Sequence, residues 1–209
     1  MAQKKTLVLT ICMAILGLFL PLLLFADFDS FFLGRFQHYD VYSDFAQTET
    51  EVQQNFTSVM DYLNYRSLDL DAQFFSHEDI IHLQDVRLVL DVMRVLAGLC
   101  FVVIFAYVYQ RKFAALRQSM RHAGIAILAM LITIGLYGIF NFDQAFVQLH
   151  ELVFWNDYWS LNPATSNLIR YFPQVIFFEV FVIYLVTTVL LAILGILGGR
   201  IDKTATRTE

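Results

Sequence analysis

The chain has 209 residues, of which 58% are hydrophobic, and its formal net charge is −5. Its mean hydropathy is +0.58, whereas soluble domains usually contain only about 45–50% apolar residues. The composition excludes an ordinary soluble domain and favours an all-α integral membrane protein, and we expect no nucleic-acid partner.

Four segments are long and apolar enough to cross a bilayer, which takes about 20 residues per helix. We predict transmembrane helices at about 7–25, 86–109, 125–143 and 174–197. The apolar part of the third is short, so we expect it to extend toward Phe146 or to be supported by its neighbours. A cleaved signal peptide is the alternative for the first, but its apolar run exceeds the about 7–15 residues of such peptides.

The lysines and arginines indicate the orientation, because short cytoplasmic loops are enriched in them. The segments before the first span, between the second and third, and after the fourth are basic. We therefore expect a multi-pass membrane protein with both termini in the cytoplasm, and with segments 26–85 and 144–172 outside. The basic residues are Lys4, Lys5, Arg111, Lys112, Arg117, Arg121, Arg200, Lys203 and Arg207.

The segment 26–85 is predicted to form a small, mostly helical extracellular cap. Thr48 and Glu51 fit a capping box, and apolar residues follow at helical spacing: Val52, Phe56, Val59, Met60 and Leu63. A second start signal, Ser76 with Asp79, precedes a pattern that runs to Tyr109. Such a helix would be roughly 50 Å long, so its first turns must stand in the cap. The aromatic stretch Phe31–Phe45 is expected at the membrane interface.

Three of the five histidines, His77, His82 and His150, lie near the outer ends of the predicted spans. The segment His77-Glu-Asp-Ile-Ile-His82 resembles a zinc motif. That motif needs histidines four apart on one helical face, and these are five apart. We therefore expect no metal and no cofactor.

Glu78, His82 and Asp85 share one helical face, where the carboxylates could orient the imidazole; a solvated polar face is the alternative. Arg87, Asp91 and Arg94 form a second row, and we expect Asp91 and Glu179 to neutralise the two arginines. This role is structural, or else Arg87 positions an anionic or carbonyl group. His150 stands among aromatic residues, where it is catalytic or simply interfacial.

Three stretches resemble the lipoprotein intramolecular transacylases of low-GC Gram-positive bacteria. The stretches are Asn55…Met60-Asp-Tyr-Leu63, Phe75-Ser-His-Glu-Asp-Ile-Ile-His82-Leu-Gln-Asp-Val-Arg87, and His150-Glu-Leu-Val-Phe154 followed by Trp159-Ser-Leu-Asn-Pro163…Leu168-Ile-Arg-Tyr-Phe-Pro173. Their order and spacing match the family over nearly the whole chain. Val153 departs from it, because family members tend to have a second phenylalanine there.

The resemblance implies a protein of the bacterial cell membrane with an extracellular active site and two catalytic histidines, His82 and His150. The residues expected to support them or to position the substrate are Glu78, Asp85, Arg87, Asn55, Tyr62, Phe154, Trp155 and Trp159. The implied substrate is a diacylglyceryl-modified bacterial lipoprotein in contact with membrane lipid. Its sn-2 acyl chain would move to the amino group of its own N-terminal cysteine, giving the lyso-form lipoprotein.

Histidine suits this chemistry, because its pKa of about 6.5 lies close to the about 7.7–8.0 of an α-amino group. We expect His82 to act as the base and His150 to stabilise the oxyanion or protonate the leaving oxygen; the reverse is nearly as plausible. No acyl-enzyme is required, and the aromatic residues Phe146, Phe154, Trp155, Tyr158 and Trp159 would form a mould for the substrate. The alternatives are a non-enzymatic accessory or binding protein, a small transporter, or an outer-leaflet hydrolase that uses the same histidines.

Overall fold

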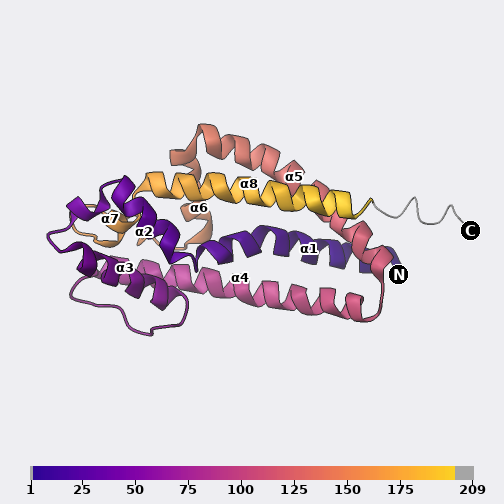
Figure 1. Ribbon diagram of the computed structural model, residues 1–209, viewed down its shortest axis with the longest axis horizontal. Coiled ribbons are helices and arrows are strands. Elements are labelled where there is room, and N and C mark those ends of the chain that lie inside the picture. Colours follow the sequence, from indigo (N-terminus) through magenta and orange to yellow (C-terminus); the bar gives the residue numbers. More distant parts are fainter. Residues whose placement is uncertain (1, 201–209) are drawn as a thin grey trace, which may run out of the picture. The chain divides into compact units, whose positions relative to one another are not determined.

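The computed structural model describes residues 2–200, with side chains from residue 6 onward (Figure 1). Within this range every regular element is a helix and no strand is present. Lys203 and Arg207, which contributed to the predicted orientation, lie outside the described residues, as do the side chains of Lys4 and Lys5.

Four helices are long and apolar enough to cross a membrane: α1 (Ala2–Phe25), α4 (His77–Tyr109), α5 (Phe113–Phe140) and α8 (Gln174–Gly198). The all-α class and the four predicted spans are therefore confirmed for the described part of the chain. The chain divides into two compact units. The first comprises Met1–Leu22, Met93–Phe142 and Val182–Glu209, and the second comprises Leu23–Val92 and Asp143–Phe181.

The third span is longer at its start than the sequence suggested. Helix α5 begins directly after a turn at Gln110–Lys112, in which Arg111 has a positive φ of 54°. Arg117 and Arg121 therefore lie on the helix rather than in a loop, where long arginine side chains can still reach water. The expected extension toward Phe146 is wrong, because α5 ends at Phe140 and a separate helix, α6 (Phe142–Val153), follows.

Within the first unit, α5 and α8 approach closely at Gly124. A Cβ at this position would collide with the backbone carbonyl oxygen of Ala192. Small residues permit such approach between membrane helices. Cys12 and Cys100 are buried in this unit as free thiols.

The second unit has an aromatic core built by α2 (Asp29–His38), the 3-10 turn η1 (Val41–Asp44), α3 (Glu49–Leu63) and α7 (Leu168–Tyr171). The capping box of Thr48 and Glu51 is present, and the five apolar residues predicted to share a face of α3 are all buried. Phe36 of α2 and Tyr171 of α7 both lie in this core.

The prediction that the stretch Phe31–Phe45 lies at the membrane interface stays a prediction, but two of its rings pack into the protein core. Phe32 and Phe36 are buried, one helical turn apart on α2, and Phe36 stacks on Tyr171 with ring centroids 5.9 Å apart. The spacing of four residues places both rings on the face of α2 that packs into the core.

Candidate functional site

The start of α4 is fixed by Asp79, whose side chain is fully buried. Its carboxylate accepts hydrogen bonds from the backbone N–H of Ser76 at 3.1 Å and from the Ser166 hydroxyl. The backbone N–H groups of Asn167 and Leu168 also donate to it, at 3.2 and 3.4 Å. Asp79 thus joins α4 to the segment that leads into α7. The helix-start motif predicted the contact of Asp79 with Ser76, but not its contacts with residues 166–168.

His82 on α4 and His150 on α6 lie close together, with ring centroids 6.0 Å apart and ring planes tilted by 36°. Aromatic rings enclose the pair. Phe154 is 5.0 Å from His82 and 5.5 Å from His150, measured between ring centroids. Phe146 and Trp159 lie 4.2 and 5.1 Å from His150. The two histidines singled out in the sequence therefore meet, although 68 positions separate them.

The orientation of His150 is set by its own helix. Its Nδ1 lies 2.7 Å from the backbone carbonyl oxygen of Phe146, to which an Nδ1–H donates. In the neutral ring this bond leaves Nε2 as the proton acceptor. Burial lowers the pKa of His150 from its ordinary value of 6.5, and the bond to Phe146 opposes the shift. The imidazole is therefore neutral near pH 7.

His82 is held differently. Its Nδ1 is buried and has no hydrogen-bond partner among the described residues. The carboxylates of the predicted row Glu78, His82 and Asp85 do not bind this nitrogen. Asp85 accepts a hydrogen bond of 2.9 Å from Asn156, and Glu78 is exposed. Asp85 and Asp79 act on the His82 ring electrostatically, through space.

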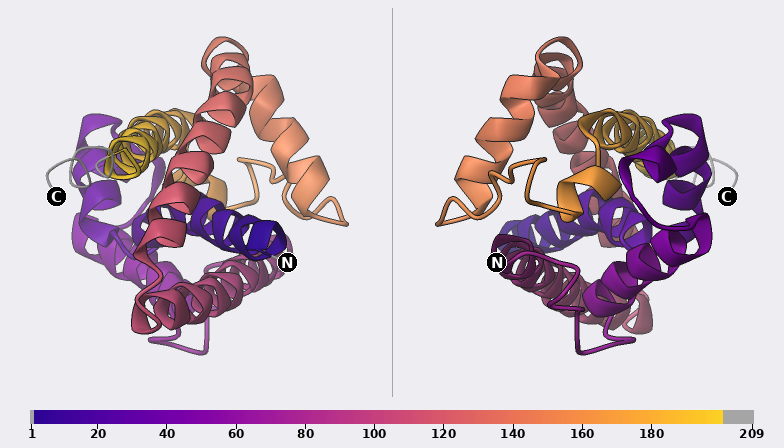
Figure 2. Two further views of the ribbon diagram at one scale, coloured as in Figure 1. Left: turned by 90° about the vertical axis from the view of Figure 1, so that its right-hand side faces the viewer. Right: turned by 90° about the vertical axis from the view of Figure 1, so that its left-hand side faces the viewer.

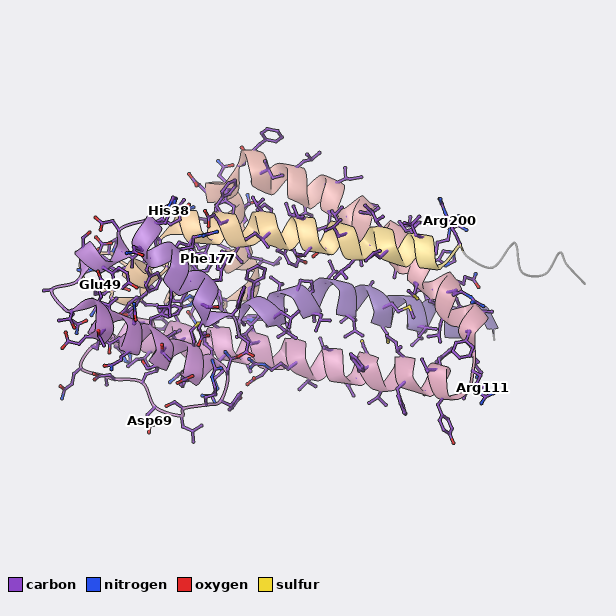
Figure 3. All side chains as sticks on the ribbon, in the orientation of Figure 1. His38, Glu49, Asp69, Arg111, Phe177 and Arg200 are labelled. Carbon is purple, nitrogen blue, oxygen red and sulfur yellow. The ribbon has the colours of Figure 1, made fainter. Side chains whose placement is uncertain are left out.

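The two histidines line a cavity of about 540 Å³ within the second unit. Most of the lining is apolar, with Phe32, Phe146, Phe172 and Phe177 among the contributing rings. Figure 3 labels Phe177 near the start of α8 and shows carbon-rich side chains along the long helices. In the described residues no group of three or more His, Cys, Asp or Glu side chains is arranged to hold a metal ion.

The remaining predicted site residues differ in whether they contact the two histidines. Phe154 and Trp159 pack on the histidines, whereas Trp155 is fully exposed and does not line the cavity. Tyr158 packs instead against His77, with centroids 6.4 Å apart. Asn55 lies away from the cavity lining, where its side chain donates to Gln47 at 3.3 Å.

Arg87 lies between two tyrosine rings, with its guanidinium carbon 4.5 Å from the ring centroid of Tyr62 and 3.6 Å from that of Tyr65. The hydroxyl of Tyr65 donates to Asp91. The expectation that Glu179 neutralises Arg87 or Arg94 is wrong. Glu179 forms an ion pair with Arg35 and accepts a hydrogen bond of 2.6 Å from Tyr39. Spacing along one helix could not reveal a partner supplied by α2.

The fold is that of an all-helical, multi-pass membrane protein whose cavity brings two half-buried imidazoles together among aromatic rings. The profile of one family, described as lipoprotein intramolecular transacylase Lit, matches residues 6–178. The chain belongs to this family of acyltransferases, which confirms the resemblance found in its sequence and the predicted enzyme class.

Solved structures show the same fold. The lipoprotein intramolecular transacylase Lit from Bacillus cereus matches with a TM-score of 0.82 and 21% identity, over 92% of this chain and 91% of that one. Two variants of that protein, with a histidine replaced by arginine or alanine, match with TM-scores of 0.74 and 0.77. Their identities are 22% and 21%, each over 95% of this chain and over 90% and 91% of theirs. No match was found among curated proteins.

Proposed function

We propose that this enzyme moves the sn-2 acyl chain of a diacylglyceryl lipoprotein onto the amino group of that lipoprotein's own N-terminal cysteine. The product is an N-acylated, lyso-form lipoprotein. The observation that carries the proposal is the pair of imidazoles, His82 and His150, 6.0 Å apart in an apolar cavity. The family membership supplies the class of reaction and substrate.

The step requires one proton to leave the amine and one to reach the glyceryl oxygen. The neutral amine attacks the ester carbonyl, a C–N bond forms, and the bond between the acyl carbon and the glyceryl oxygen breaks. Nε2 of His150 is the acceptor that the bond to Phe146 leaves free, so we assign it the amine proton. His82 then protonates the departing oxygen and regains a proton from the imidazolium of His150, so that both rings end neutral. This is the reverse of the assignment first favoured from the sequence.

The cavity supplies the second requirement, which is orientation. Amine and ester belong to the same molecule but are separated by a flexible thioether and glyceryl chain. Well-oriented intramolecular reactions reach effective molarities of about 10⁵–10⁸ M. Phe146, Phe154 and Trp159 form rigid walls beside the histidines. No acyl-enzyme is needed.

We place this site on the extracellular side of the bacterial membrane, with both chain termini in the cytoplasm. The basic residues Arg111, Lys112, Arg117 and Arg121 gather around the turn between α4 and α5. Such residues favour the cytoplasmic face. The start of α4, which carries His82, is at the opposite end of that helix.

The test is mass spectrometry of a lipoprotein's N-terminal peptide from a host that makes diacyl lipoproteins and expresses this chain. We expect wild type to move one acyl chain to the amine, and His82→Ala and His150→Ala not to do so. His38→Ala is the matched control, since His38 is exposed on α2 and does not line the cavity.

An unmoved acyl chain, with wild-type protein present in the membrane, contradicts the proposal. Release of free fatty acid without N-acylation would instead identify a hydrolase. If N-acylation survives both histidine substitutions, the proposed reaction stands but the two-histidine mechanism is wrong.

A further inference from the structure

The short helix α6, which carries His150, has two different faces. Phe146 and His150, one turn apart, line the cavity. Leu149 and Leu152 point away from it and are 56% and 83% exposed. Trp155 follows the end of the helix and is fully exposed. Three large apolar side chains, Leu149, Leu152 and Trp155, are therefore exposed on α6 and just beyond its end, in a segment that is not itself a membrane span.

Both ends of the α6 region are tied to the helices that enter the membrane. At its start, Asp143 accepts a hydrogen bond of 3.0 Å from Gln174, the first residue of α8. Just beyond its end, Asn156 donates to Asp85, directly before the apolar part of α4. Because spans alternate in direction along the chain, α4 and α8 begin on the same side. The helix is thus held at the level where two spans begin.

The length and direction of α6 agree with this placement. Twelve residues make a helix of about 18 Å, too short for a hydrocarbon core of about 30 Å. In the right-hand view of Figure 2, α6 is seen lengthwise and the first turns of α8 almost end-on. Helix α6 therefore runs across those turns, along the membrane boundary rather than through it.

We propose that Leu149, Leu152 and Trp155 anchor α6 in the interfacial layer of the bilayer and thereby hold His150 at the depth of the lipid glyceryl esters. Amphipathic helices bury their apolar face in this layer, and tryptophan is enriched there. Gln144 and Glu151 are exposed on the same helix and supply the side that faces water. The second half of the inference rests on the proposed function, because only a substrate ester gives that depth a catalytic meaning.

The chain offers a direct test, since it contains only two tryptophans. The variant Trp159→Phe leaves Trp155 as the sole tryptophan. It is placed in phosphatidylcholine vesicles that contain lipids brominated at a shallow or a deep acyl position. We expect shallow bromines to quench Trp155 more than deep ones, and aqueous iodide to quench it little. Dominant quenching by iodide overturns the anchor, as does shielding from all three quenchers, which would indicate a protein contact.

A pair of charge substitutions connects depth to activity. We expect Leu152→Glu to move Trp155 toward iodide and to lower the yield of N-acylated lipopeptide severalfold. Gln144→Glu places the same charge on a side of α6 that already faces water, and should change neither reading. Unchanged activity in Leu152→Glu, despite a shift of Trp155 into water, overturns the role of depth. The quenching pattern needs no substrate, so it stands or falls separately from the transfer reaction.

Discussion

The chemistry of the site is set at the residue scale by how each imidazole is held. His150 donates Nδ1–H to the carbonyl oxygen of Phe146, one turn back on its own helix. This local hydrogen bond therefore leaves Nε2 as the proton-accepting nitrogen of the neutral ring. His82 has no such bond among the described residues, and the nearby Asp85 is taken by Asn156. The two histidines thus have different surroundings, which agrees with the different roles that we propose for them.

The pH dependence should report the substrate amine rather than His150. Burial lowers the pKa of His150 below 6.5, so this base is already neutral where an α-amine of pKa about 7.7–8.0 is still protonated. We expect the rate to rise with pH up to about 8 and then to level off. The measurement is N-acylation of a purified lipopeptide across this range. A substrate whose amine has a lower pKa should shift the rise in rate to lower pH. If the rise does not shift, the substrate amine is not the group that controls the pH dependence.

Ser160 tests whether the transfer is direct. Among the described residues it is the one serine that lines the cavity, so it is the position from which we would expect a serine acyl-enzyme to form. We expect Ser160→Ala to retain most of the N-acylating activity, because neither proton transfer passes through its hydroxyl. Loss of activity in a folded Ser160→Ala protein, together with an acylated Ser160 in the wild type, would favour a covalent intermediate.

Asp79 should matter for stability. Asp79→Asn removes a buried charge that accepts from Ser166, Asn167 and Leu168. Hydrogen bonds to charged groups contribute about 1.5–3 kcal/mol each, so we expect a loss of about 2–3 kcal/mol in unfolding free energy. Denaturant unfolding in detergent measures it. Asp69→Asn, on an exposed loop, is the control and should unfold as wild type does.

At the scale of the elements, helix starts are encoded locally. The capping boxes at Thr48 and at Ser76 were legible because the paired side chains are three residues apart. Where α5 begins and ends was less legible. Charged residues in its first turns resembled a loop, and no glycine or proline directly follows its last residue, Phe140.

Removal of the cap on α3 gives a prediction at this scale. Thr48→Ala leaves the Glu51 backbone N–H without its side-chain acceptor, and the loss of such a cap typically costs about 1 kcal/mol. We expect a drop of that size in the unfolding free energy. Gln54→Ala, at an exposed position in the middle of α3, should have little effect, so equal losses in the two variants would contradict the role of the cap.

At the scale of the whole molecule, the chain forms two compact units with different contents. The unit Leu23–Val92 with Asp143–Phe181 holds the cavity and both histidines. The other unit is made of long apolar helices, and its close contacts depend on small residues such as Gly124 and Ala192. Substitutions in that unit should therefore act through packing.

Two glycines distinguish packing from helix propensity. Gly124→Ala must push against the carbonyl oxygen of Ala192, whereas Gly98→Ala on α4 has open space around the new methyl group. We expect Gly124→Ala to lower the thermal midpoint in detergent. Gly98→Ala should leave it unchanged or raise it slightly, because alanine is the better helix former by about 1 kcal/mol. Equal shifts in both would show that the contact does not matter.

The sequence by itself determined the four membrane spans, two helix starts, the family and the two histidines, because these depend on composition, short-range spacing and local motifs. The tertiary structure decided which side chains meet. In the structure His150 lies beside His82, and Trp155 is exposed outside the cavity. Asp85 binds Asn156, and Glu179 pairs with Arg35. Each partner comes from a different helix or loop. A contact between distant segments depends on how the helices pack, which spacing along one helix does not encode.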